Sequence, residues 1–346
     1  MVNEKDVIDW IQLFYTKNVG IKSFWTLINL YKNATNALRH VKFQFDRREA
    51  EKIYKKAKGN VLIAIDDKYP KHLKSYTLPP PILYYSGNYC LLNENLISIV
   101  GARNASITGH SVAKKFADQL SEYFPIASGM ARGIDTCALT SAIKYGKAIA
   151  VLPFGLDNIY PQENTKIFQS ICSNGVAITE VPPGRNPDQG MFFARNKLLV
   201  SISSGIVVIE AALKSGTMNT AELALDMGCE LMVVPGSPLD PRSFGSNLLI
   251  KNGANLVQTA QDVLEIIKPN ATIQKSIQQH ITQNYSNRDF DEVSNIVLTQ
   301  LSSIPVSIDV LADVTNIAIS ELLAVVSQLE LSGKVAKTYN NEIVLI

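Results

Sequence analysis

The stretch Ser128–Asp135, which reads SGMARGID, combines residue types that readily bind an anion. Gly129 and Gly133 allow the backbone to turn tightly and let a ligand approach closely. The segment Ile134–Tyr145 follows with helical spacing, and its first N–H groups and positive dipole end would face the turn. Arg132 adds a cation whose planar donor fork suits phosphate. The stretch therefore predicts an anion-binding turn, although an ordinary strand-to-helix turn fits it about equally well when it is considered alone.

A second segment repeats this arrangement. The apolar strand Ile97–Val100 leads into a turn and a helical pattern, and the turn carries Gly101, Arg103, Ser106 and Gly109. Two glycine-rich turns that each carry an arginine, both at strand ends, favour anion binding over an ordinary turn.

A parallel sheet would position both turns. Between Leu96 and Ile267, short and almost continuously apolar runs alternate with helical patterns, as strands buried on both faces of a sheet require. The runs begin at Ile97, Ala148, Val176, Ile206 and Leu231. This alternation predicts an α/β fold with a doubly wound, mostly parallel, Rossmann-like sheet. Ligands of such sheets bind outside the carboxyl ends of the strands.

Several polar groups follow the later strands at this edge. Ser215, Gly216 and Thr217 form another small-residue turn before a helical pattern. Carboxylates also occur near the edge, at Asp135, Glu180, Glu210 and Glu222. We expect structural roles for these acids, with Asp135 as a helix cap and Glu210 as a partner of Arg132 or Arg195.

The N-terminal region reads as short helices over residues 3 to 57. A hairpin at Asn18–Lys22 resembles helix-hairpin-helix and SAM-like modules, which touch nucleic-acid backbones through loop N–H groups; plain helical packing explains it at least as well. Residues 1 to 75 hold 15 Lys/Arg against 8 Asp/Glu. The basic run Lys52–Lys58 is better explained as a solvated helix face than as a nucleic-acid contact.

The C-terminal region follows a polar segment, 268–289, that we interpret as a linker. Residues 290–346 then predict three helices and a β-hairpin that turns at Asn340-Asn341, which is the winged-helix order. The third helix, Ser320–Leu331, contains no Lys or Arg, which favours protein contact or packing over DNA reading. The predicted domains are therefore 1–78 (helical), 79–267 (Rossmann-like), the linker 268–289, and 290–346 (winged-helix-like).

Composition limits the class of protein. With 46% hydrophobic and 18% charged residues, the chain of 346 residues has an ordinary globular composition. Its acidic, polar start predicts no signal peptide, and no apolar run reaches the length of a membrane span. The four cysteines lack CxxC spacing, and the four histidines show no metal-binding pattern either. We expect a cytoplasmic protein without disulfide, metal or cofactor.

Seven motifs follow one another through the predicted Rossmann-like domain. They are VGARNASITG from Val100, SGMARGID from Ser128, GLDNIYP from Gly155, FFARNKLLVSIS from Phe192, VIEAALKSGTMNTAELAL from Val208, VPGSP from Val234 and GSNLLIKNGA from Gly245. In this order they resemble the DNA-processing protein A (DprA/Smf) family, and the resemblance covers essentially the whole chain. Two residues depart from the family pattern. Leu139 stands where His is usual, and Lys197 replaces the second Arg of an RNR motif, which keeps the charge but loses the bidentate fork.

The resemblance implies that the Rossmann-like domain binds single-stranded DNA rather than a dinucleotide. By motif position, the phosphate-binding candidates are Gly101, Arg103, Ser106, Gly109, Ser128, Gly129, Arg132, Gly133, Arg195, Asn196, Lys197, Ser215, Gly216 and Thr217. Phe192 and Phe193 could stack on bases, although core packing is the better explanation for at least one of them. The resemblance also implies that the protein protects incoming single-stranded DNA, loads a RecA-family recombinase during natural transformation and recombination, and forms a homodimer.

Two other functions remain open at this point. The fold also resembles nucleotide phosphoribohydrolases of the lysine-decarboxylase-like group, whose signature places Gly-Thr a few residues before a catalytic Glu. Gly216-Thr217 and Glu222 echo that signature in part, but Ser215-Gly216 replaces its double glycine and the spacing to the Glu differs. The remaining motifs lack a nucleophile or phosphate-binding lysine, so we expect no enzyme. A weaker hypothesis is a scaffold that binds proteins through its terminal domains.

Overall fold

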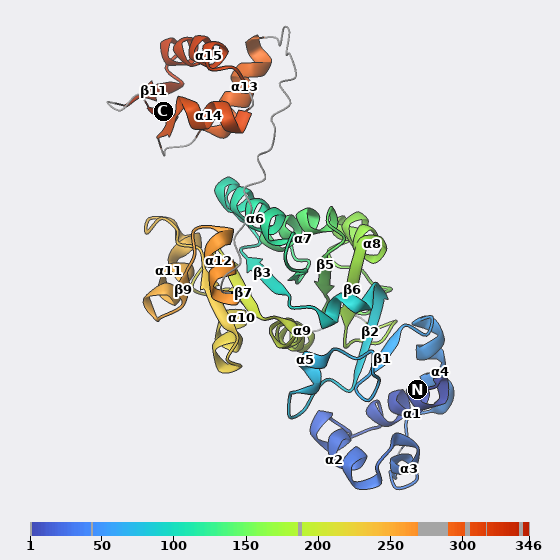
Figure 1. Cartoon of the computed structure of the whole chain (residues 1–346). Helices are drawn as coiled ribbons and strands as arrows, with labels where there is room; N and C mark the ends of the chain where they lie inside the picture. The colour runs from blue at the N-terminus through green and yellow to red at the C-terminus, as the bar shows by residue number, and fades with distance from the viewer. Residues whose placement is uncertain are drawn as a thin grey trace. The chain divides into compact units, whose positions relative to one another are not determined.

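The chain folds into two compact units, which are considered separately (Figure 1). The computed structural model describes residues 2–42, 44–185, 189–268, 290–301, 305–315, 317–338 and 342–345. The first unit holds the described residues up to 268, and the second holds those from 290. Residues 269–289 of the predicted linker lie outside the described ranges, and the predicted domain boundaries stay predictions. Within the described ranges, every helix falls short of the length and apolarity needed to cross a membrane.

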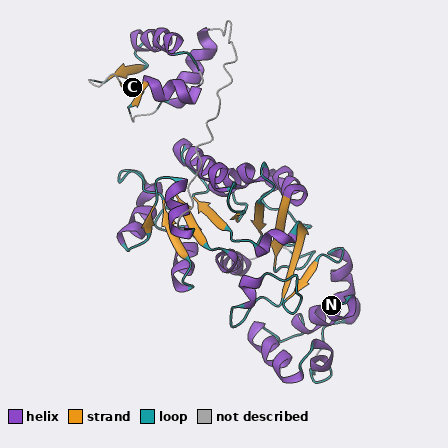
Figure 2. Cartoon of the chain, in the orientation of Figure 1, coloured by secondary structure: helices purple, strands orange, loops and turns teal. Residues whose placement is uncertain are grey.

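A nine-stranded sheet organises the first unit, and Figure 2 shows its strands between helices. In spatial order the strands are β1 (Val61–Ile63), β2 (Ile82–Gly87), β6 (Gly175–Thr179), β5 (Ala148–Val151), β4 (Ile126–Ser128), β3 (Ile97–Gly101), β7 (Gly205–Ile209), β8 (Glu230–Val233) and β9 (Asn255–Leu256). The seven strands from β6 to β9 pair in parallel, whereas β1 and β2 extend the sheet antiparallel. The predicted mostly parallel sheet is confirmed.

Alternate residues of each central strand enter two different cores. In β7, Ile206 and Val208 pack on one face, while Val207 and Ile209 pack on the other. Helices α6 (Ile107–Leu120), α7 (Ile134–Ile143), α8 (Thr165–Asn174) and α12 (Ala260–Ile267) cover the second face. Helices α9 (Gln189–Ile202) and α10 (Gly216–Asp226) cover the first face. The remaining helices of this region are α5 (Lys71–Lys74) and α11 (Phe244–Lys251).

The N-terminal helices continue the first of these cores. They are α1 (Glu4–Phe14), α2 (Ile21–Tyr31), α3 (Ala34–Leu38) and α4 (Arg47–Lys56). Trp10 of α1 packs edge-on against Phe24 of α2, with ring centroids 5.0 Å apart. The predicted helical region is confirmed, and β1, which lies within the predicted domain 1–78, pairs with β2 beyond its boundary.

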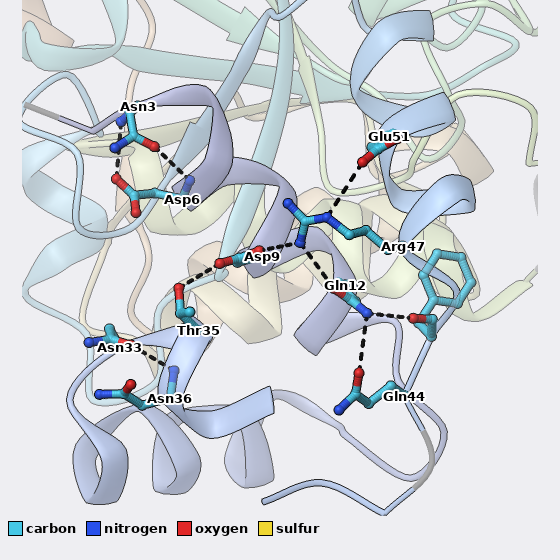
Figure 3. A network of polar contacts seen from close by, with 11 residues as sticks. Asn3, Asp6, Asp9, Gln12, Asn33, Thr35, Asn36, Gln44, Arg47 and Glu51 are labelled. Carbon is cyan, nitrogen blue, oxygen red and sulfur yellow. Dashed lines mark hydrogen bonds and ion pairs between the residues drawn. The ribbon is translucent and has the colours of Figure 1, made fainter. Parts of the chain in front are cut away.

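A polar network joins three of these helices (Figure 3). The buried carboxylate of Asp9 accepts a hydrogen bond from Arg47 Nη1 at 2.6 Å and another from Thr35 Oγ1 at 2.5 Å. Gln12 Nε2 donates to the carbonyl oxygen of Phe45 at 2.9 Å. These contacts connect α1 to α3 and α4, so the buried acid is fully paired.

The second unit has the winged-helix order. Its elements are α13 (Phe290–Gln300), β10 (Val306–Ser307), α14 (Ile308–Thr315), α15 (Ile319–Leu331), β11 (Val335–Lys337) and β12 (Glu342–Leu345). A small core joins its helices to its antiparallel strands through Val297, Leu322, Val326, Val335 and Ile343. This architecture confirms the winged-helix prediction, while the predicted turn at Asn340-Asn341 lies outside the described residues.

Candidate functional site

The sheet has a topological switch point between β3 and β7. The chain adds strands in one direction from β3 to β6 and in the other direction from β7 to β9. Crevices at such points bind the ligands of doubly wound sheets. A groove of about 530 Å³ lies there, and we call it the central groove. The predicted site residues that line it are Gly101, Arg103, Gly129, Phe192, Phe193, Arg195, Asn196, Ser215, Gly216 and Thr217.

Arg195 is the most firmly held cation of the central groove. Its side chain rises from α9 and the residue is only 8% exposed. Nη1 donates to the carbonyl oxygen of Gly129 at 2.5 Å and to that of Val151 at 3.3 Å, and Nε donates to Asn196 Oδ1 at 2.9 Å. A Cβ at Gly129 would meet the guanidinium of Arg195, so glycine is required for this close approach.

Asp135 supplies the negative charge behind Arg195. Burial raises the pKa of the Asp135 carboxyl, and the charge of Arg195 together with N–H groups of the turn opposes that shift. One of these groups, the N–H of Ala131, donates to Asp135 Oδ2 at 3.3 Å. The predicted role of Asp135 as a helix cap is wrong: Gly133 is the N-cap of α7, and the Asp135 carboxylate instead accepts from the turn before the helix, beside Arg195.

The two glycine-rich turns pack directly against each other. Gly133 adopts φ 76°, and a Cβ there would meet the backbone of Ala102 and Arg103. The N–H of Ile134 donates to the carbonyl oxygen of Ala102 at 3.2 Å. This contact places Arg103 at the mouth of the central groove, beside the turn that holds Arg195.

Glu210 has a different partner from the one that we predicted. Its carboxylate accepts hydrogen bonds from the N–H of Ser106 at 2.8 Å and from Ser106 Oγ, rather than binding Arg132 or Arg195. Ser106 Oγ also accepts from the N–H of Gly109 at 2.8 Å and caps α6. Because of this cap, α6 begins at Ile107. Ser106 and Gly109 thus stabilise the turn and the start of α6, and they do not line the central groove.

Ser128 and Thr217 also have structural contacts. Ser128 Oγ donates to the carbonyl oxygen of Ile99 at 2.6 Å, which ties β4 to β3 in the buried sheet. Thr217 Oγ1 donates to the carbonyl oxygen of Gly101 at 3.0 Å. Ser215 caps α10 by accepting from the N–H of Met218, and both Ser215 and Gly216 line the groove.

Arg132 lies in a neighbouring hollow rather than in the central groove. This hollow of about 210 Å³ shares Arg103 and Arg195 with the groove and also contains Tyr160. Arg132 is paired through Nε to Glu163 Oε1 at 2.6 Å and through Nη2 to Oε2 at 2.9 Å. The guanidinium faces solvent, so a phosphate would have to compete with Glu163 for it.

Three aromatic residues line the two hollows: Phe192 lines both, Phe193 lines the central groove and Tyr160 lines its neighbour. Phe193 is 57% exposed and Phe192 is half-buried, so neither belongs to the buried cores. Tyr160 is also 57% exposed. Exposed rings beside arginines are the arrangement on which successive bases of a single strand stack.

Lys197 is brought to a different place from the other predicted cations. It is exposed on α9 and lines neither hollow. Its charge acts instead on Glu180, where burial raises the carboxyl pKa to about 7 and Lys197 opposes the shift. Residues three or four apart on a helix share a face, whereas Arg195 and Lys197 are two apart. Their side chains are therefore expected to point in different directions.

The sequence analysis missed four polar residues of the central groove, namely Asn104, Asn219, Thr220 and Arg242. Arg242 pairs with Asp240, with Nη2 and Oδ2 2.8 Å apart. It belongs to the loop after β8, whose carboxyl end meets the same edge of the sheet as β3. That register was the signal that could have identified it.

Comparison with known families assigns each part of the chain. Residues 60–268 match the family described as DNA recombination-mediator protein A. Residues 4–54 match a DprA-like N-terminal HHH domain, and residues 286–338 match a DprA winged helix domain.

Curated relatives agree with this assignment. The chain is 36% identical over 223 residues to the DNA processing protein DprA of Streptococcus pneumoniae, which covers 64% of this chain and 78% of that protein. It is 34% identical over 215 residues to the Bacillus subtilis protein of the same name, covering 61% and 72%. Protein Smf of Escherichia coli is 31% identical over 279 residues, covering 80% and 75%.

Two solved structures are similar as well. The X-ray structure of DprA from Streptococcus pneumoniae aligns with a TM-score of 0.65 and 29% identity, over 77% of this chain and 97% of that one. A structure of DprA from Helicobacter pylori, described by its single-stranded DNA binding mode, aligns with a TM-score of 0.54 and 32% identity. That alignment covers 57% of this chain and 91% of the other.

Proposed function

Because the chain belongs to the DNA recombination-mediator protein A family, we propose that it binds single-stranded DNA in the central groove. The observation that carries the proposal is the pairing of Arg103 and Arg195 at the switch point of the sheet, beside the exposed ring of Phe193. The similar protein from Helicobacter pylori is described as binding single-stranded DNA, which supports the same ligand here.

The chemistry of the groove suits a strand of any sequence. Arginines bind phosphates without reading bases, and exposed rings stack on any base. Arg103 is the accessible cation, because it has no carboxylate partner within the described ranges, whereas Arg195 is fixed by backbone carbonyls. Arg195 would therefore set the local positive potential while Arg103 contacts the phosphate directly.

Three finer proposals follow from the family assignment. The protein protects incoming single-stranded DNA and loads a RecA-family recombinase onto it during natural transformation and recombination. It acts as a homodimer, in which two joined grooves hold one strand with higher avidity than either alone. It works in the cytoplasm, where reducing conditions suit its four free cysteines.

Binding to matched single- and double-stranded oligonucleotides tests the main proposal. Fluorescence anisotropy should show tighter binding of the single strand, and Arg103→Ala should weaken it about tenfold while Lys115→Ala, on the exposed side of α6, leaves it unchanged. Lys197→Ala tests whether the site residues are better chosen from the structure or from the motif alone, since Lys197 belongs to the motif but does not line the groove. Equal loss with Lys115→Ala and Arg103→Ala would contradict a specific groove.

The enzyme alternative has a separate test. Glu222 is exposed on α10 and does not line the groove that Gly216 and Thr217 enter. Cleavage of nucleoside monophosphates by the purified protein, abolished by Glu222→Gln, would replace DNA binding with the phosphoribohydrolase function.

A further inference from the structure

A second pocket at the same edge of the sheet is not used by the central groove. It has a volume of about 290 Å³ and lies between α1 and α9, beyond the carboxyl ends of β5 and β6. Leu152 and Glu180 follow those strands, Phe14 and Tyr15 come from α1, and Leu198 comes from α9. We call it the side pocket.

The side pocket has apolar and aromatic walls around one acid, Glu180, and two arginines, Arg185 and Arg195. Its volume is at the lower limit of small-ligand pockets, about 300 Å³, which suits a single planar ring system rather than a chain. The hydroxyl of Tyr15 is engaged with that of Tyr84, 3.3 Å away, which holds the Tyr15 ring in place. Glu180 is the carboxyl that such a ring would meet.

Arg195 connects the side pocket to the central groove. It lines both hollows, and the two lie along one edge of one sheet. The first half of α9 is their common wall, with Phe192 and Phe193 on the groove and Met191 and Ala194 on the side pocket. Arg195, itself buried, is thus a wall that the two hollows share, so a strand bound in the central groove lies one helix away from the side pocket.

We propose that the side pocket binds one nucleobase of the strand, with Glu180 at the hydrogen-bonding edge of that base. The inference rests on the proposed function, because the central groove must deliver the strand. An ionised carboxylate accepts hydrogen bonds through both oxygens, which matches the adjacent ring N–H and amino N–H of guanine. Thymine offers one N–H between two carbonyl oxygens and fits the carboxylate poorly. The pocket thus adds a preference for guanine to a groove that otherwise ignores sequence.

Glu180 also makes this preference depend on pH. Burial raises its pKa to about 7, against the attraction of Lys197 on α9. Of the other groups around the pocket, Tyr15 and Tyr84 have pKa values raised by burial and stay neutral, and Arg185 and Arg195 also line it. Between pH 6 and 8, Glu180 is accordingly the group that changes from a neutral acid, which donates one hydrogen bond, to a carboxylate.

The test compares oligonucleotides of equal length, all dT or all dT with one central dG, by fluorescence anisotropy. Wild-type protein should prefer the dG strand at pH 8 by about fivefold or more, and this preference should shrink at pH 6. Glu180→Gln should lose the preference and its pH dependence while the affinity for the dT strand stays within about twofold. Glu222→Gln, which removes an exposed carboxylate of α10, is the matched control and should behave as wild type.

A second variant guards against a folding defect in the first. Ala194→Phe fills the pocket from an exposed position of α9 and should also remove the preference for dG. Binding of both strands with equal affinity by wild-type protein at pH 8 would overturn the side pocket and leave the central groove standing. The same holds if Glu180→Gln retains the full preference. If neither strand binds wild-type protein at all, the proposed function fails as well.

Discussion

The first unit buries an Asp beside an Arg twice, with opposite consequences. In the N-terminal helices, Asp9 receives hydrogen bonds from Arg47 and Thr35, and the group joins three helices (Figure 3). At the sheet edge, Asp135 lies behind Arg195, whose own donors are directed mainly at backbone carbonyls. The two arginines also differ in exposure. The side chain of Arg47 is 42% exposed, whereas the whole residue Arg195 is 8% exposed.

The difference separates a structural contact from a prepared site. Arg47 reaches inward from solvent and pairs with the buried acid Asp9, so its charge stabilises the fold. Arg195 is itself buried, and a glycine, an acid and two carbonyl oxygens hold it beside a groove. A buried cation that several contacts hold at the switch point of a sheet is typical of a binding site.

Removing Arg195 should produce the largest effect. Arg195→Ala leaves the carboxyl of Asp135 buried without its cation, which costs about 3 to 5 kcal/mol in the free energy of unfolding. Urea denaturation measures this loss, and single-strand binding should fall with it. The double variant Arg195→Ala/Asp135→Asn is the control, since it removes both charges and should recover part of the stability without restoring binding. A loss below about 1 kcal/mol in Arg195→Ala would contradict the coupling of these residues.

Glu180 extends the comparison to a half-buried acid whose nearby cation, Lys197, is exposed. Its pKa is raised in the folded protein from 4.5 to about 7, so the folded state holds the proton more tightly than the unfolded chain. The free energy of unfolding should therefore fall as the pH rises from about 4.5 to about 7. Glu180→Gln should abolish this loss, and should be more stable than wild type by about 2 to 3 kcal/mol at pH 8 and equally stable at about pH 4, below the pKa of the unfolded chain.

Urea denaturation of both proteins across this pH range measures the difference. The exposed acid Glu222 provides the control, because Glu222→Gln should follow the wild-type curve at every pH. Parallel curves for Glu180→Gln and wild type would mean that the carboxyl is well solvated.

Removing Arg47 should have a smaller effect, confined to stability. Asp9 keeps the hydrogen bond from Thr35, and water can reach the place of the half-exposed Arg47 side chain. We expect Arg47→Ala to lower the free energy of unfolding by about 1 to 2 kcal/mol with single-strand affinity unchanged. Arg48→Ala, which changes the next and exposed residue of α4, is the matched control and should change neither. Weaker DNA binding in Arg47→Ala alone would move part of the site onto the N-terminal helices.

The sequence predicts the frame of this molecule better than its contacts. The apolar runs at β3, β5, β6, β7 and β8 were recognisable because a strand buried on both faces must be apolar throughout. The strands β1, β4 and β9 are too short for such a pattern to stand out. The glycine-rich turns that carry arginines were recognisable at the ends of predicted strands, and the structure has a groove at that edge of the sheet.

Partners of the charged side chains depend on contacts far apart in the chain. Glu210 meets Ser106, and Arg132 meets Glu163, through loops whose approach no local spacing encodes. Helical geometry alone separates Lys197 from Arg195, but the sequence analysis grouped the two residues in one site. Sequence reasoning therefore named many residues that line the groove but also Ser106, Gly109 and Lys197, which do not. Only the structure separates Arg103, which has no carboxylate partner in the described ranges, from a paired cation.

The distinction between free and paired cations gives the smallest and most specific prediction. Each phosphate neutralised on single-stranded DNA contributes about −0.7 to the slope of log K against log salt. Arg103→Ala should flatten that slope by about 0.7, whereas Arg132→Ala should change it less, because Glu163 already neutralises Arg132. Glu163→Gln should release Arg132 and steepen the slope, and this gain should vanish in Glu163→Gln/Arg132→Ala. Lys55→Ala/Lys56→Ala, on the exposed end of α4, controls for remote steering. If that double change flattens the slope more than Arg103→Ala does, the strand is held by the N-terminal helices and not by the central groove.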